Sequence, residues 1–215
     1  MTVKRLLTAL AFSAAVLPAF AQLSVSGGAP ASGITGYNGQ PAFYTGPADA
    51  ELMSLSSFNG LLNAGAGGTL EITYLGSEAG HNNRFKLGDF SLTTGSHPTA
   101  FSQSYYVDVG AGNLNFSFKD LVTGTGVANG GALSGNRQNA YFVFDSSQFE
   151  FWPGNDMSTT RTFQYILGFN DGGGDKDFDD MVIGLNLVPV PEPGTYALML
   201  AGLAAVGFVA VRRRA

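Results

Sequence analysis

The chain reads FQYILGFN over residues 163–170 and MVIGLNL over residues 181–187, and these two runs decide its fold. Every second side chain in them is apolar: Phe163, Tyr165, Leu167 and Phe169 in the first, and Met181, Ile183, Leu185 and Leu187 in the second. Successive side chains of a β-strand point to opposite faces, so this pattern predicts two half-buried strands. Only residues 171–180 lie between them, and we expect this segment to be a hairpin connection.

The same alternation continues towards the N-terminus. Residues 69–74 and 114–119 again place an apolar side chain at every second position. Three further strands are expected, at residues 84–92, 104–109 and 140–145. A weak helical pattern covers 49–62, and segments rich in glycine, asparagine and serine predict loops at 76–83, 110–113 and 124–139. Many short strands separated by turns predict an all-β domain over residues 22–188, a β-sandwich or jelly-roll-like fold.

The N-terminal segment is typical of a secretory signal peptide over residues 1–21. Lys4 and Arg5 precede an apolar run, and Ala19 and Ala21 form the small-residue exit that signal peptidase recognises. We expect cleavage after Ala21, with export of the chain.

The C-terminal segment has three parts over residues 189–215. A proline-rich stretch containing Pro191, Glu192 and Pro193 precedes an apolar run at 196–211, and a cluster of three arginines follows: Arg212, Arg213 and Arg214. The apolar run predicts a single transmembrane helix of about 24 Å, slightly short of the bilayer core. The arginines are expected to stay in the cytoplasm, so the preceding domain faces outward.

The charge of the middle segment limits its partners. Residues 22–190 carry 15 of the 16 acidic residues and 6 of the 11 basic ones, a net charge of −9. This charge argues against nucleic acid and anionic lipid as partners. The chain has no cysteine, which excludes disulfides, thiol nucleophiles and thiolate metal sites.

The three-part C-terminal segment resembles the PEP-CTERM sorting signal over about the last 28 residues. The resemblance implies export, transient anchoring in the inner membrane of a Gram-negative bacterium, and cleavage by an exosortase near Pro191, Glu192 and Pro193. It also implies delivery to the cell surface or extracellular matrix of bacteria that make exopolysaccharide and biofilm. The alternative is a plain C-terminal anchor with a proline-rich linker.

The connection at residues 171–180 concentrates negative charge. Five carboxylates and one lysine lie within ten residues; the acids are Asp171, Asp175, Asp177, Asp179 and Asp180. Their mutual repulsion is relieved if a hard cation binds, and Ca²⁺ accepts six to eight oxygen ligands. The alternative is a solvated acidic turn in which aspartates accept backbone N–H groups. The segment differs from an EF-hand loop at its sixth and twelfth positions, which are Asp180 and Asn186.

The middle segment also resembles an uncharacterised domain family of bacterial surface proteins. The resemblance rests on residues 70–85 together with residues 173–180, which lie in a Gly-Gly-x-Asp-x-Asp-Phe-x-Asp loop. It implies a β-sandwich and carries no established activity. An acid is frequent upstream of this loop, where the chain has Asn170.

The sequence therefore predicts a non-enzymatic, exported protein with a structural or adhesive role in an exopolysaccharide matrix. A calcium-dependent carbohydrate-binding module is the alternative, and a glycan-cleaving enzyme ranks third. His81 and His97 lie in polar or proline-flanked turns without a recognisable nucleophile, and Glu71 and Glu78 show no feature of a catalytic pair.

Overall fold

The structure is a computed structural model that describes residues 22–30, 56–77, 79–96, 103–132, 139–145, 161–171, 178–189 and 193–212. The chain divides into two compact units, Phe20–Val190 and the pair of terminal segments Met1–Ala19 and Pro191–Ala215. The predicted signal peptide, including Ala19 and Ala21, lies outside the described residues.

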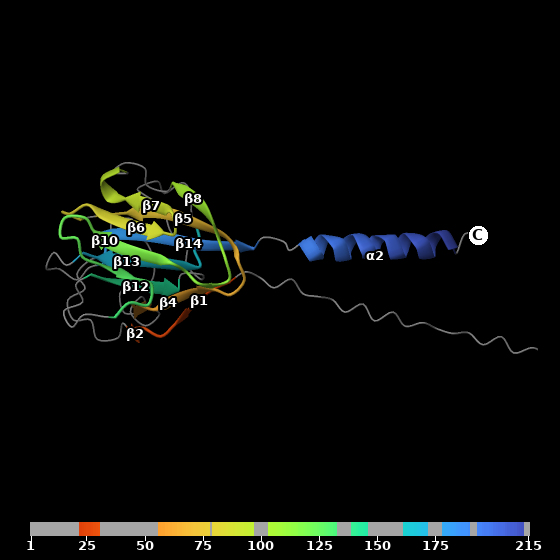
Figure 1. Ribbon diagram of the computed structural model, residues 1–215, viewed down its shortest axis with the longest axis horizontal. Coiled ribbons are helices and arrows are strands. Elements are labelled where there is room, and N and C mark those ends of the chain that lie inside the picture. The colour runs from red at the N-terminus through yellow and green to blue at the C-terminus, as the bar shows by residue number, and fades with distance from the viewer. Residues whose placement is uncertain are drawn as a thin grey trace, which may run out of the picture. The chain divides into compact units, whose positions relative to one another are not determined.

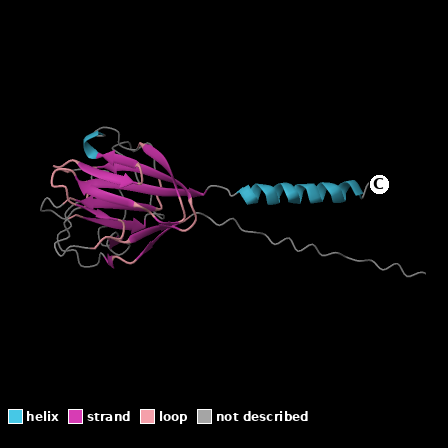
Figure 2. Ribbon diagram, viewed as in Figure 1, coloured by secondary structure: helices cyan, strands magenta, loops and turns pink. Residues whose placement is uncertain are grey.

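The unit Phe20–Val190 is built from antiparallel strands in three sheets (Figures 1 and 2). The seven-stranded sheet has the order β2 (Ala29–Pro30), β3 (Ser56–Phe58), β12 (Ala140–Asp145), β13 (Tyr165–Asn170), β14 (Met181–Pro189), β5 (Gly68–Gly76) and β8 (Ser104–Val109). The four-stranded sheet has the order β11 (Gly126–Ala128), β10 (Phe116–Asp120), β6 (Asn83–Leu87) and β7 (Phe90–Thr93). The small sheet joins β1 (Leu23–Ser26), β4 (Leu61–Ala64) and β9 (Gly112–Asn113), and a short 3₁₀ helix, η1 (Thr94–Ser96), follows β7.

One hydrophobic core joins the three sheets. Phe118 of β10 stacks on Phe169 of β13, with ring centroids 5.0 Å apart and an interplanar angle of 6°. Leu62 of β4 is fully buried in the same cluster. Because the strands of the two larger sheets present apolar side chains to each other, the architecture is the predicted all-β, sandwich-like fold.

The two runs at 163–170 and 181–187 form neighbouring antiparallel strands, as predicted, with Tyr165 opposite Leu185. All four alternating residues of β14 lie in the main core: Met181, Ile183, Leu185 and Leu187. Phe163 differs from the prediction, because it precedes β13 and packs with Ile166 and Val182 in a second cluster. Its ring covers Gly184, where an added Cβ would lie 2.6 Å from the ring.

One predicted strand and the predicted helix were wrong. The run at 84–92 is a hairpin of β6 and β7 rather than one strand, because Gly88 turns the chain with a φ of +56°. The described part of the predicted helix at 49–62 contains β3 and the start of β4. Between these strands, Asn59 donates its backbone N–H to Tyr141 O at 2.8 Å and accepts from Tyr141 N through its side chain at 2.9 Å. Pairing with β12 therefore outweighs the weak helical pattern.

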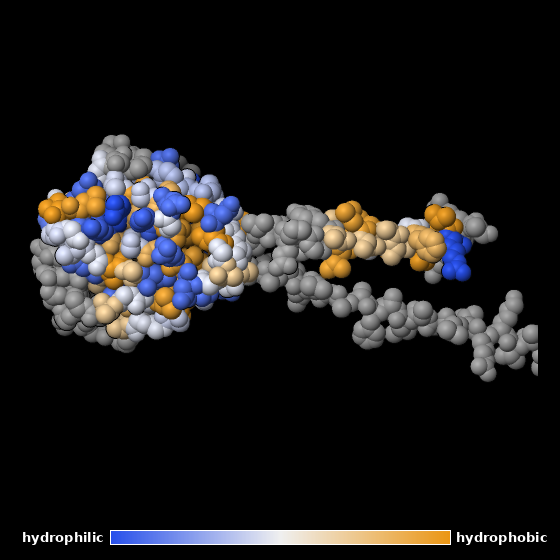
Figure 3. All heavy atoms as spheres, viewed as in Figure 1, coloured by the Kyte–Doolittle hydropathy of each residue, from blue (hydrophilic) through white to orange (hydrophobic). Residues whose placement is uncertain are grey.

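The C-terminal unit contains helix α2 (Pro193–Arg212), at the place where the sequence predicts a sorting helix. Residues 197–212 are all exposed. Figure 3 shows hydrophobic residues along the length of the helix and a hydrophilic group at its far end. No helix among the residues described is long and apolar enough to cross a membrane.

Candidate functional site

The ends of the acidic connection are fixed by β13 and β14. Asp171 follows β13 and is 5% exposed, whereas Asp179 and Asp180 precede β14 and are 3% and 7% exposed. The backbone N–H of Asp171 donates to Asp180 Oδ2 at 2.7 Å, which ties the two ends together. Asp175 and Asp177 lie outside the described residues.

Phe178 anchors the second end of this connection in the domain. It has a φ of +58°, which is unusual for a residue with a side chain, and its ring is fully buried. The ring centroid lies 5.0 Å from that of Phe58 and 5.9 Å from that of Phe142. Burial of the aromatic ring offsets the cost of the strained backbone.

Residues from β5 and β6 bind both ends of the connection. Ser77, just after β5, donates its hydroxyl to Asp180 O at 2.6 Å. Asn83, at the start of β6 and fully buried, donates Nδ2 to Asp171 Oδ2 at 2.9 Å and to Asp180 O at 3.4 Å. The pairing of β5 with β14 brings these distant segments together.

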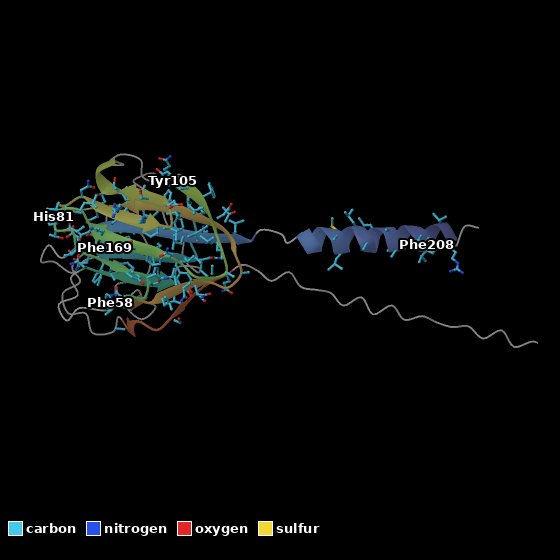
Figure 4. The ribbon with its side chains drawn as sticks, in the orientation of Figure 1. Phe58, His81, Tyr105, Phe169 and Phe208 are labelled. Carbon is cyan, nitrogen blue, oxygen red and sulfur yellow. The ribbon has the colours of Figure 1, made fainter. Side chains whose placement is uncertain are left out.

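His81 and Asp120 complete this group, which we call the polar cluster: His81, Asn83, Asp120, Asp171 and Asp180. His81 Nδ1 lies 2.9 Å from Asp120 Oδ2 and 3.8 Å from Asp171 Oδ2. Figure 4 places His81 at one end of the β domain. The hydrogen bond with Asp120 raises the pKa of His81, so the cluster favours an imidazolium between two carboxylates.

Asp120 is held by short hydrogen bonds at the end of β10. Its carboxylate accepts from Val122 N at 2.7 Å and from the Thr123 hydroxyl at 2.6 Å, in addition to His81. Burial alone would raise the pKa of Asp120, but these hydrogen bonds together outweigh it and hold the pKa below its usual range. Asp120 is therefore an ionised, fully buried carboxylate that joins the β10 turn to His81.

The described residues do not decide whether the acidic connection binds calcium. Among the residues that the structure describes, no three histidines or carboxylates are placed to hold a metal ion. Asn83 Oδ1 is buried without a hydrogen-bond partner, but Asp175 and Asp177, on which the hypothesis also depends, are outside the description. Calcium binding at Asp171, Asp175, Asp177, Asp179 and Asp180 stays a prediction.

Sequence reasoning missed three members of the cluster, His81, Asn83 and Asp120. His81 and Asn83 lie in the segment 70–85, and the resemblance to a surface-protein family combines this segment with the acidic connection. The hydrogen bonds of Ser77 and Asn83 join the same two segments in the structure, so the resemblance was the available signal. Nothing near Asp120 in the sequence points to it. Its position follows from the pairing of β10 with β6, which sets Asp120 opposite Asn83.

The predicted sorting residues lie in and around α2. Pro193 is the first residue of the helix and Arg212 the last. Pro191, Glu192, Arg213 and Arg214 are outside the described residues. The structure thus describes the helix of the predicted signal and leaves its cleavage motif as a prediction.

The model of the PEP-CTERM protein-sorting motif matches residues 189–214. This match confirms the prediction of a PEP-CTERM sorting signal, and it implies an exported protein that is transiently anchored in a membrane and processed by an exosortase. No curated protein and no solved structure matches the chain. The resemblance of the middle segment to a surface-protein family stays a prediction.

Proposed function

From the sorting motif at residues 189–214, we propose that this PEP-CTERM protein has a non-enzymatic, structural or adhesive role. Its site of action is the cell surface or the exopolysaccharide matrix of a Gram-negative bacterium. Export and exosortase processing deliver the β domain to this site, and the domain then acts as a building element.

The burial of the polar cluster is the observation that favours a structural role over catalysis. Asp120, Asp171 and Asp180 are at most 7% exposed, and their hydrogen bonds are made to the protein's own strands and turns. A catalytic or sugar-binding carboxylate has to reach its ligand, whereas these carboxylates join β10, β13 and β14. Their chemistry is used to stabilise the fold.

The sorting part of the proposal is tested in a host that makes an exosortase. The double variant Pro191→Ala/Glu192→Ala should stay in the membrane fraction with its C-terminal segment uncut. The control Val190→Ala changes a neighbouring apolar residue and should be processed like the wild type. Normal cleavage and release of the double variant would contradict exosortase sorting.

The structural part is tested by deletion of the gene and by a polysaccharide pull-down. A structural role predicts a weakened matrix in the deletion strain and no retention of the domain on a defined glycan. Calcium-dependent retention would favour the carbohydrate-binding module instead. Turnover of a polysaccharide that a single carboxylate substitution abolishes would establish an enzyme.

A further inference from the structure

Among the strands that the structure describes, β8 is the last strand of the seven-stranded sheet. Among the described strands it pairs only with β5, in a continuous antiparallel register, and Figure 1 shows it at the border of the domain. Natural edge strands are protected by proline, lysine or a bulge. The sequence of β8, SYYVDV, has no proline or lysine and its only charged residue is Asp108.

The free backbone groups of β8 follow from its pairing with β5. Tyr74 N donates to Gln103 O at 3.3 Å, just before the strand begins. Hydrogen-bonded residues alternate along an antiparallel pair, so Tyr105 and Val107 bond to β5 and the residues between them do not. The N–H and C=O groups of Ser104, Tyr106 and Asp108 therefore point to the free edge. Within the described part of the chain, no residue forms a backbone hydrogen bond with them there.

The side chains of the same three residues lie on the outer face of the sheet. Tyr106 is 66% exposed. Arg161 Nη1 donates to Ser104 Oγ at 2.7 Å, and Asp108 Oδ1 accepts from Thr69 Oγ1 at 2.8 Å. Arg161 Nη1 also lies 3.8 Å from Glu71 Oε1, to which the Tyr106 hydroxyl donates at 3.4 Å, so this carboxylate of β5 shares the positive group at the Ser104 end. A negative group lies at the Asp108 end of the edge.

We propose that β8 pairs with β8 of a second copy of this chain, antiparallel and about a two-fold axis at Tyr106. In this register Tyr106 lies opposite Tyr106 of the second copy, and Ser104 lies opposite Asp108. Each of these pairs exchanges two N–H···O bonds, so all the free groups of the edge are used. The two seven-stranded sheets become one continuous sheet.

Charge selects this register. Arg161 contacts Ser104, and Ser104 lies opposite Asp108 of the second copy. The Asp108 carboxylate of each copy therefore comes close to the Arg161 guanidinium of the other, and the two-fold symmetry makes this contact twice. The two Asp108 carboxylates do not face each other, which avoids repulsion between like charges. The two exposed Tyr106 rings form an aromatic cross-strand pair.

The inner face of the edge offers an apolar contact for the same partner. A groove of about 450 Å³ lies beside β8, and its apolar lining includes Leu87, Phe90, Val107 and Leu114. On the inner face the register sets Tyr105 of the second copy opposite Val107, at the side of this groove. Tyr105 already packs on Phe90 of its own copy, with ring centroids 5.3 Å apart, and is partly buried there. Strand pairing buries little area by itself, and covering the exposed part of this ring adds apolar contact to the interface.

The association is tested on residues 20–190, because this compact unit contains all three sheets and their core. Sedimentation equilibrium from about 10 µM to about 1 mM should show a monomer–dimer equilibrium. Tyr106→Pro removes an N–H that faces the free edge without removing a bond to β5, and it should abolish dimers. Asp108→Lys should do the same by repelling Arg161, with the backbone unchanged.

Two controls separate these effects from general damage. Tyr106→Phe keeps the backbone and the ring, and Val122→Lys adds the same positive charge at an exposed turn beyond β10, where Val122 is 65% exposed. Both should dimerise like the wild type, and circular dichroism should show every variant folded. A wild-type domain that is monomeric at all concentrations would overturn the proposal, even if the edge binds a foreign peptide.

Cysteine cross-linking tests the register, because the chain has no cysteine of its own. Two Cα atoms at position 106 would be about 5.5 Å apart, within the range of a disulfide. Two Cα atoms at position 104 would be offset by four residues, about 14 Å. Tyr106→Cys should therefore form a disulfide dimer on oxidation and Ser104→Cys should not. Equal cross-linking of both variants would refute this pairing.

Discussion

Replacement of Asn129 should destabilise the domain, because this side chain joins all three sheets. Its Oδ1 accepts from Leu62 N at 2.8 Å, and its Nδ2 donates to Leu62 O and Leu114 O, each at 2.8 Å. The hydroxyl of Tyr141, which donates to Gly60 O at 2.8 Å, also lies 3.3 Å from Oδ1. Every hydrogen-bonding group of the amide is thus used between β4, β12 and the loops beside them.

The expected loss for Asn129→Ala follows from the groups left behind. The N–H of Leu62, a fully buried residue, loses the Asn129 oxygen that accepts it, which costs about 1–3 kcal/mol. Leu114 O loses a donor worth about 1 kcal/mol, whereas Leu62 O keeps its bond from Leu114 N. The free energy of unfolding should therefore fall by about 3 kcal/mol.

Urea unfolding of residues 20–190, followed by circular dichroism, measures this loss. With a slope of about 2 kcal/mol per M, the midpoint should fall by about 1.5 M. Asn113→Ala is the matched control, because it removes one exposed side-chain bond, from Asn63 Nδ2 to Asn113 Oδ1, and should cost about 0.5 kcal/mol or less. Equal midpoints for the two variants would refute the reasoning.

Two further predictions concern the polar cluster. Because Asp120 raises the pKa of His81, the charged imidazole stabilises the fold below its unfolded pKa of about 6.5. This contribution is lost as the pH rises through the folded pKa. With a chelator present, the urea midpoint of the wild type should therefore be higher than that of His81→Gln at about pH 5.5. The difference between the two midpoints should be smaller at about pH 9, and a difference that does not change with pH would contradict this linkage. If the acidic connection binds calcium with a dissociation constant of about 10⁻⁴ M, about 10 mM calcium is about 100 times that constant. The free energy of unfolding should then be about 2.7 kcal/mol higher than in chelator. Asp175→Asn with Asp177→Asn should abolish the shift, and an unshifted wild type would indicate an acidic turn.

The strands could be predicted where burial on one face is regular. The period of two in β14 identified its core residues, and the expected strands at 104–109 and 140–145 coincide with β8 and β12. The prediction failed at Phe163 and at residues 56–64, where packing against distant segments decides the conformation. The segment 124–139 was predicted to be a loop, yet it contains β11, which is held by pairing with β10.

The sequence by itself determined the sorting of this protein and the all-β class of its domain. Both depend on local order along the chain: a proline-rich motif, an apolar run and an arginine cluster in one case, and alternation with period two in the other. Only the tertiary structure decided that His81 and Asp120 meet the acidic connection and that Asn129 joins the sheets. It also decided that β8 lies at the end of the seven-stranded sheet, among the strands described. These features depend on which strands pair, and pairing between residues far apart in sequence is set by the packing of the whole core.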